Sequence, residues 1–164
     1  MNFPDPGPVW LSIQLAAITV VVLLAIGTPV AWWLATTRSR ARAPVEAVVA
    51  LPLVLPPTVL GFYLLMLLGP GGAIGSLWLQ VTDTTLTFSF AGLVIASVLY
   101  SLPFTVQPLQ AAFEAVGPEP LEAAATLGAS PLRRFVSIAS PLALRGYVTA
   151  AVLTFAHTLG EFGA

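Results

Sequence analysis

The stretch Leu15–Leu34 reads Leu-Ala-Ala-Ile-Thr-Val-Val-Val-Leu-Leu-Ala-Ile-Gly-Thr-Pro-Val-Ala-Trp-Trp-Leu and contains no charged residue. A helix needs roughly 20 consecutive apolar residues to cross the hydrocarbon core of a bilayer. Three arginines follow shortly after it, at Arg38, Arg40 and Arg42. An apolar run of this length that ends in a basic turn indicates a membrane-spanning helix.

The composition of the whole chain also indicates that it lies in a lipid bilayer. Apolar residues make up 57% of the 164 residues and charged residues only 8%, whereas a soluble domain carries about a quarter charged residues. No basic stripe with interleaved aromatic residues occurs, so nucleic-acid binding has no support. The absence of cysteine excludes disulfides, thiolate metal sites and thiol catalysis. We expect an all-α polytopic membrane protein.

Charge-free intervals predict about four spanning helices. Besides the first stretch, such intervals contain the apolar segments 47–68, 88–110 and 146–160, and His157 is the only residue in the last of these that titrates near neutral pH. The Gly69-Pro-Gly-Gly sequence is expected to end the second helix near Leu68. The segment Ala73–Val81 is too short to cross, so we expect it along the outer interface with Trp78 as an anchor.

The placement of the arginines predicts the orientation. All six lie in two groups, at 38–42 after the first predicted helix and at 133–145 before the fourth. The N-terminal tail and the loop at 69–87 contain none. Basic loops stay in the cytoplasm, so the N-terminus is expected outside and both arginine-bearing loops in the cytoplasm.

The segment 111–139, between the third and fourth predicted spans, carries helix signals of its own. Pro118 and Pro120 suit a helix start, and Gly128 suits a C-terminal cap. A second start follows directly, because Ser130 can cap a helix and Pro131 fits its first position. We therefore predict two short cytoplasmic helices joined at Gly128.

The same segment resembles the EAA loop of ABC-importer permeases. Glu122-Ala123-Ala124 is followed by three residues and Gly128, then by nine residues and the sequence Ile138-Ala-Ser-Pro141. The family pattern has a leucine where this chain has Ser140, a position at the start of the fourth predicted helix. The alternative is an ordinary loop helix, but the match at several spaced positions argues against it.

The resemblance implies a coupling role for this loop, which we place at 112–141. In the family, the short helix before the glycine docks in a groove of a separate ATP-hydrolysing subunit and transmits its motion. Small alanine side chains allow a close approach to a partner, and leucines can fill a pocket. The residues expected to carry the coupling are Leu121, Glu122, Ala123, Ala124, Ala125, Leu127 and Gly128.

A finer resemblance covers nearly the whole chain. The stretch Leu51–Gly61 (Leu-Pro-Leu-Val-Leu-Pro-Pro-Thr-Val-Leu-Gly), the glycine-rich Gly69–Gly75 and the terminal Leu159–Ala164 (Leu-Gly-Glu-Phe-Gly-Ala) resemble molybdate permeases. Sulfate and thiosulfate permeases share related stretches. Such permeases continue past the last stretch, so we expect 1–164 to be a single transmembrane domain that is C-terminally incomplete relative to the family, as a fragment or through loss of the rest.

The resemblance further implies an alternating-access importer for molybdate. One chain would be half of a homodimeric pore in the cytoplasmic membrane, together with cytoplasmic ABC ATPase subunits and an extracytoplasmic molybdate-binding protein. ATP and Mg²⁺ would be held by the ATPase, because no nucleotide motif occurs in this sequence. We expect no catalytic residue, metal or cofactor in this chain. A sulfate, thiosulfate or tungstate permease is the alternative.

Prolines in the second predicted span indicate a permeation route. They remove backbone donors and kink a helix, and freed carbonyls are tolerated in a membrane where protein or water meets them. Simple curvature for packing is the alternative. Pro103 and Pro108 in the third predicted span give the same argument with less force. The pathway candidates in the second span are Pro56, Pro57, Thr58 and Gly61.

His157 and Glu161 complete the pathway candidates. They are four residues apart, so they share one face of the fourth predicted helix. A metal site lacks a third ligand, and a proton relay lacks further carboxylates at membrane depth. We expect a structural role, with Glu161 near the outer end of the helix.

Two other classes of membrane protein compete with the importer hypothesis. An intramembrane enzyme needs a nucleophile and a base, or a metal centre, and His157 has no such companion in the predicted spans. An ATP-independent channel has no need of the EAA-type loop. Co-purification with an ATPase separates the importer from both.

Overall fold

The computed structural model describes residues 6–162, and this part of the chain is helical without a strand. Asn2, Gly163 and Ala164 lie outside the described residues. The elements are α1 (Pro6–Thr36), α2 (Arg42–Val54), α3 (Pro57–Leu68), α4 (Ala73–Thr82), α5 (Phe90–Val116), α6 (Glu119–Thr126), α7 (Pro131–Arg134), the π-helical turn η1 (Phe135–Ala139), α8 (Ser140–Leu142) and α9 (Leu144–Phe162).

The all-α expectation is confirmed, and within residues 6–162 the helices supply between two and four membrane spans. α1 and α5 are each long and apolar enough to cross a bilayer alone. The other two candidates are bent pairs: α2 with α3, at 111°, and the segment Pro131–Leu142 with α9, at 69°. The count reaches four if each bent pair is one span.

The second predicted span was expected to be one kinked helix, and this expectation is wrong. The chain turns a corner at Leu55 and Pro56, whose ψ angles of 134° and 138° are extended rather than helical. A residue that precedes proline is disfavoured in the helical region by the proline ring. Since Leu55 precedes Pro56 and Pro56 precedes Pro57, two successive residues leave the helix, and the break is sharper than one internal proline produces.

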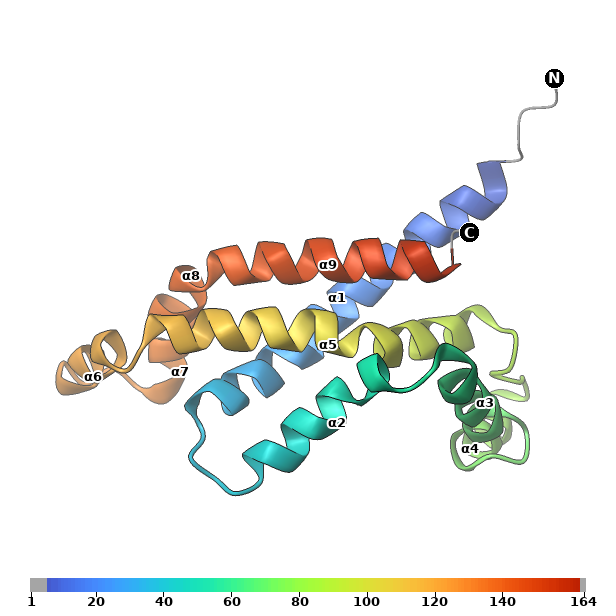
Figure 1. Ribbon diagram of the computed structural model, residues 1–164, viewed down its shortest axis with the longest axis horizontal. Helices are drawn as coiled ribbons and strands as arrows, with labels where there is room; N and C mark the ends of the chain where they lie inside the picture. Colours follow the sequence, from blue (N-terminus) through green and yellow to red (C-terminus); the bar gives the residue numbers. More distant parts are fainter. Residues whose placement is uncertain (1–5, 163–164) are drawn as a thin grey trace.

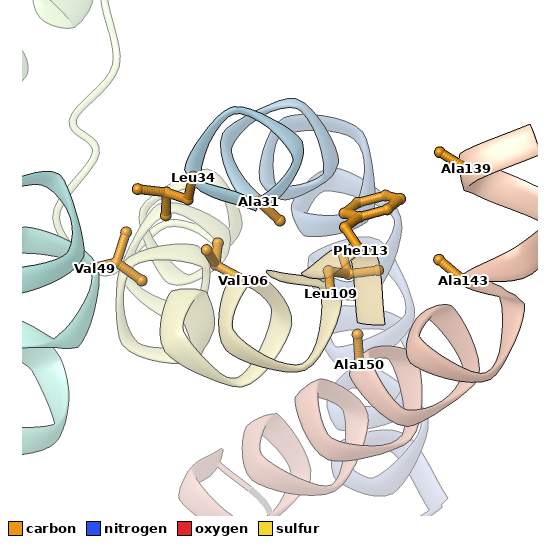
Figure 2. Close-up of a cluster of buried hydrophobic side chains, with 9 residues drawn as sticks. All are labelled: Ala31, Leu34, Val49, Val106, Leu109, Phe113, Ala139, Ala143 and Ala150. Carbon is orange, nitrogen blue, oxygen red and sulfur yellow. The ribbon is translucent and has the colours of Figure 1, made fainter. Parts of the chain in front are cut away.

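The centre of the fold is a bundle of α1, α5 and α9, with α2 packed beside α5 (Figure 1). Figure 2 shows the buried core, in which Leu34 of α1 and Val49 of α2 meet Val106, Leu109 and Phe113 of α5. Small side chains from η1, from the corner between α8 and α9, and from α9 itself complete the core: Ala139, Ala143 and Ala150. A ring of aromatic contacts surrounds Phe113, with centroid distances of 5.2 Å to Trp32, 5.9 Å to Phe135 and 6.0 Å to Tyr147.

The two arginine-bearing segments lie at the same end of the molecule. The α1–α2 turn, α6, α7 and the start of α9 gather there, whereas α3 and α4 lie at the opposite end (Figure 1). Arg38, Arg42 and Arg134 line one cavity at this end. This shared end is what the sequence predicted. Which side of the membrane it faces stays a prediction.

The third predicted span continues beyond its expected end. α5 runs without interruption through Pro103 and Pro108 to Val116, so residues 112–116 of the predicted loop are the last part of this helix. After Gly128 the chain enters α7, as predicted, with the Ser130 hydroxyl accepting a hydrogen bond from the Arg133 backbone N–H at 3.3 Å and Pro131 at the first position.

The turn after α7 widens into the π-helical η1. Pro141 has no N–H to donate to the carbonyl of Ser137, four residues earlier, so a regular α-helical ladder is interrupted here. Ser140, the departure from the family pattern, donates its hydroxyl to Tyr147 Oη at 3.1 Å. This bond joins α8 to α9 across the corner at Ala143.

Candidate functional site

Helix α6 presents the EAA-type sequence at the arginine-bearing end of the molecule (Figure 1). Pro118 precedes the helix, and Glu119 and Glu122 lie in its first turn, where carboxylates are favoured by the helix dipole. The predicted start and end of this helix are confirmed. Glu122, Ala123 and Ala125 are exposed, Ala124 is buried against the chain, and Leu127 is 89% exposed.

Leu121 lies differently from the other predicted coupling residues. It is half-buried and packs against the core cluster of its own chain. The side of α6 that is open to a partner therefore spans Ala125, Glu122, Ala123 and Leu127, with Glu122 and Ala123 between the other two on the helix surface. Docking of this surface on a partner stays a prediction. Leu121 packs α6 against the core of its own chain.

Gly128 ends α6 in a left-handed conformation, with φ of +82°. Its N–H donates to the carbonyl of Ala125 at 2.9 Å, and the N–H of Ala129 donates to the carbonyl of Ala124 at 3.0 Å. This pair of bonds is the Schellman motif, which satisfies the last carbonyls of a helix and reverses the chain. The predicted glycine cap is therefore confirmed. It sets the angle between α6 and α7.

His157 and Glu161 lie on one face of α9, as predicted, with 3.6 Å between His157 Nε2 and Glu161 Oε1. His157 stacks on Phe104 of α5 at a centroid distance of 4.0 Å, and its Nδ1 is 3.0 Å from Ser101 Oγ. Within residues 6–162 no group of three or more His, Cys, Asp or Glu residues comes together. The imidazole is held by α5, which agrees with a structural role.

Buried side-chain hydroxyls near His157 form hydrogen bonds between α5 and α9. They were not predicted from the sequence. Thr105 and Thr154 share a hydrogen bond of 2.6 Å, and Ser101 and Thr158 share one of 3.1 Å. We call these four residues the hydroxyl seam. A signal was available, because Ser101 and Thr105 are four residues apart, as are Thr154 and Thr158, and this spacing places each pair on one helix face.

The prolines of the predicted pathway lie at the α2–α3 corner. Pro56, Pro57 and Thr58 are exposed there, and a Cβ at Gly61 would meet no atom within 4 Å. One hydrogen bond ties this corner to the bundle, from Tyr100 Oη to the carbonyl of Pro57 at 2.6 Å. Tyr100 adjoins Ser101, so the corner and His157 are both tied to the same turn of α5.

A charged network lies at the arginine-bearing end, between α2 and α5. Arg42 contacts Glu46 at 2.8 Å and Glu114 at 2.7 Å. Gln110 donates to the same two carboxylates, at 2.7 Å and 3.1 Å. These groups are partly exposed, so the pairs contribute little to stability individually. They hold the start of α2 against the last turns of α5.

Comparison with known proteins identifies the family. Residues 27–164 match the family described as binding-protein-dependent transport system inner membrane component. The chain belongs to this family. It is a multi-pass inner-membrane component of such a transport system, and the importer resemblance drawn from the EAA motif is confirmed.

Individual members of the family are similar over nearly the whole chain. The molybdenum transport system permease protein ModB of Azotobacter vinelandii is 60% identical over 159 residues, which cover 97% of this chain and 70% of that protein. ModB of Escherichia coli K12 is 38% identical over 161 residues, covering 98% and 70%. A probable molybdenum ABC transporter permease protein of Haloferax volcanii is 40% identical over 153 residues, covering 93% and 55%.

Proposed function

We propose that this chain is the membrane-spanning subunit of an ATP-driven importer of molybdate. The observation that carries the proposal is the 60% identity to a molybdenum transport system permease over 97% of the chain. The alternatives, namely sulfate permeases, ATP-independent channels and intramembrane enzymes, lack comparable support. Within this proposal the chain is a pore subunit, and the hydrolysis of ATP belongs to a partner.

The assembly that we propose has two copies of this chain, two cytoplasmic ABC ATPase subunits and an extracytoplasmic molybdate-binding protein. The exposed face of α6, with Ala123, Ala125 and Leu127, supports docking on the ATPase, because small side chains let two backbones approach closely. ATP binding closes the ATPase dimer, and α6 moves with it. Since Leu121 packs on the core around Phe113, this movement reaches α1, α5 and α9.

The charge distribution supports passage of a dianion without tight binding. All six arginines lie in the two segments at one end of the bundle, outside the apolar stretches. A buried guanidinium would hold the anion, whereas hydroxyls and backbone N–H groups can bind it weakly and release it. Selectivity among oxyanions then resides mainly in the binding protein.

Uptake by the reconstituted assembly tests the substrate. Vesicles that contain the intact transporter, its binding protein and ATP are expected to accumulate molybdate and tungstate, which are near-identical tetrahedral dianions. A large excess of sulfate is expected to compete poorly, and replacing ATP with ADP is expected to abolish uptake. Sulfate uptake without molybdate uptake would refute the substrate but leave the family intact, and ATP-independent uptake would refute the mechanism.

A further inference from the structure

A cavity of about 550 Å³ lies at the arginine-bearing end, between the end of α1, the end of α5 and the helices α6 and α7. Its charged lining comprises Arg38, Arg42, Arg134, Glu114 and Glu122. We call it the basic cavity, because the guanidinium groups outnumber the carboxylates. The cavity shares Leu121 and Glu122 with the predicted coupling segment, but the function proposed above assigns no role to its arginines.

The three arginines of the basic cavity differ in whether they are paired with a carboxylate. Arg42 is paired with Glu46 and Glu114, at 2.8 Å and 2.7 Å. In the described part of the chain, Arg38 and Arg134 form no ion pair. The Nε of Arg134 is buried and has no hydrogen-bond acceptor. Two guanidinium groups without a carboxylate partner therefore line this side of the cavity, which favours a ligand with anionic oxygens.

An apolar groove of about 600 Å³ adjoins the basic cavity. It lies between α1 and the α7–η1 segment, and its lining includes Leu24, Ala25, Thr28, Leu132 and Phe135 but no charged residue. Trp32 and Pro131 line both hollows, so the groove continues directly from the cavity. The lining residues on α1 recur on one face of the helix, from Leu24 to Thr36.

The dimensions of this continuous site match a lipid. The α1 face from Leu24 to Thr36 extends for about 18 Å at 1.5 Å per residue, whereas one leaflet of the hydrocarbon core is about 15 Å thick. Trp32 marks the junction, and tryptophan is enriched at the level of lipid headgroups. Basic pockets at the cytoplasmic ends of membrane helices are known to bind anionic headgroups.

We propose that the basic cavity and the apolar groove together bind one anionic phospholipid. Its phosphate lies between Arg38 and Arg134, the two arginines of the cavity that form no ion pair in the described part of the chain, and one acyl chain lies along α1 in the groove. A free oxyanion would use the arginines but leave the groove empty, and an apolar surface of a second copy would fill the groove but leave Arg38 and Arg134 unpaired. The site depends on insertion of α1 in a membrane and is independent of the transported substrate.

Lipid retention tests the proposal on the full chain. The protein is reconstituted in nanodiscs with equal amounts of phosphatidylglycerol and phosphatidylcholine, and the lipids that stay bound on release are identified by native mass spectrometry. The protein is expected to retain phosphatidylglycerol preferentially. Arg38→Gln with Arg134→Gln should reduce this preference by about tenfold or more. The matched control, Arg133→Gln with Arg145→Gln, removes the same charge outside the cavity and should leave the preference unchanged.

A second pair of variants tests the groove without altering charge. Ala25 and Ala17 are both exposed alanines of α1, but only Ala25 lines the groove. Ala25→Phe is expected to reduce retention of phosphatidylglycerol, and Ala17→Phe is expected to leave it intact. This pair decides the question if the double arginine variant fails to fold, which circular dichroism monitors.

Four outcomes would overturn the proposal. They are equal retention of the two lipids, equal loss in the arginine control, equal loss in Ala17→Phe, and displacement of the lipid by inorganic phosphate or molybdate at the same arginines. The last outcome would assign the cavity to a free oxyanion. A fifth contrary outcome is loss of the dimer in Ala25→Phe with no lipid bound to the parent protein, which would assign the groove to a second copy. None of these outcomes bears on molybdate uptake.

Discussion

Two glycines show how single residues set the geometry of this protein. Gly128 has a positive φ that ends α6, and Gly146 lies where α9 crosses α5. At Gly128 the backbone conformation excludes a β-branched side chain. At Gly146 the neighbouring helix excludes any side chain, because an added Cβ would overlap the side chain of Ala112. The first constraint is local and the second depends on packing.

Gly128→Val is expected to uncouple the transporter without preventing membrane insertion. Valine in a left-handed conformation costs on the order of 1–2 kcal/mol, so the turn between α6 and α7 should change its shape. ATPase activity stimulated by the loaded binding protein should fall. Gly128→Asn is the matched control, since asparagine tolerates this conformation, and it should preserve most of the activity. Full stimulation in Gly128→Val would count against the coupling role.

Gly146→Ala is expected to destabilise the bundle. The added methyl group must push α9 away from Ala112 and from the Pro108 carbonyl, which would lie 3.3 Å from the new Cβ. Overpacking of this kind costs about 1–3 kcal/mol. Unfolding by SDS in mixed micelles measures the change. Gly160→Ala is the control on the same helix, because a Cβ there meets no atom within 4 Å. An equal effect of both substitutions would refute the packing explanation.

At the scale of elements, the contact between α5 and α9 combines small residues with buried hydroxyls. Without water to compete, interhelical hydrogen bonds and close packing are what hold membrane helices together. The hydroxyl seam supplies both, because serine and threonine are small and each hydroxyl has a partner on the facing helix. His157 extends the seam with its bond to Ser101.

A double-mutant cycle on Thr105 and Thr154 measures the seam. Thr105→Val and Thr154→Val each leave one buried hydroxyl without its partner and are expected to cost about 1 kcal/mol. The double variant removes both hydroxyls, so it should cost less than the sum by about 0.6 kcal/mol. Thr149→Val is the control, because the Thr149 hydroxyl is exposed and bonds to the Arg145 carbonyl of its own helix. Strict additivity of the two single effects would show that the pair contributes nothing specific.

At the scale of the whole molecule, the feature that bears on function is the separation of the EAA-type helix from the α3–α4 end. α6 and the arginines occupy one end, and α3 with α4 occupies the other (Figure 1). A pore subunit needs such a division, because the ATPase and the binding protein approach from opposite sides. The corner between α2 and α3 lies on the path between the two ends and carries Pro56, Pro57 and Thr58.

Thiol labelling in sealed vesicles tests the orientation. The chain has no native cysteine, so single introduced thiols report cleanly. A thiol at the exposed Gly71, where an added Cβ meets no atom within 4 Å, or at Asn2 outside the described residues, is expected to react with an impermeant reagent from the outside. A thiol at Ser39 or Ala129 should react only after permeabilisation. The reverse pattern would place α6 outside the cell and refute its role with a cytoplasmic ATPase.

The sequence by itself determined the features that depend on neighbouring residues. Apolar stretches, arginine clusters and the caps around Gly128 were all predictable, because solvent preference and backbone conformation act within a few turns. Even the corner at Pro56 follows from a local rule, although its angle of 111° does not. The EAA spacing and the family were likewise available before any coordinates.

Only the tertiary structure decided which distant residues meet. Nothing in the sequence indicates that Ser101 bonds to Thr158, or that Arg38 and Arg134 line the same cavity. Their placement depends on the rotation and spacing of α1, α5, α7 and α9. Those in turn are set by how Ala150, Leu109 and Phe113 fill the core (Figure 2). Packing depends on the whole chain, which is why the pairing of hydroxyls across the seam and the residues of the proposed lipid site could not be inferred from the sequence alone.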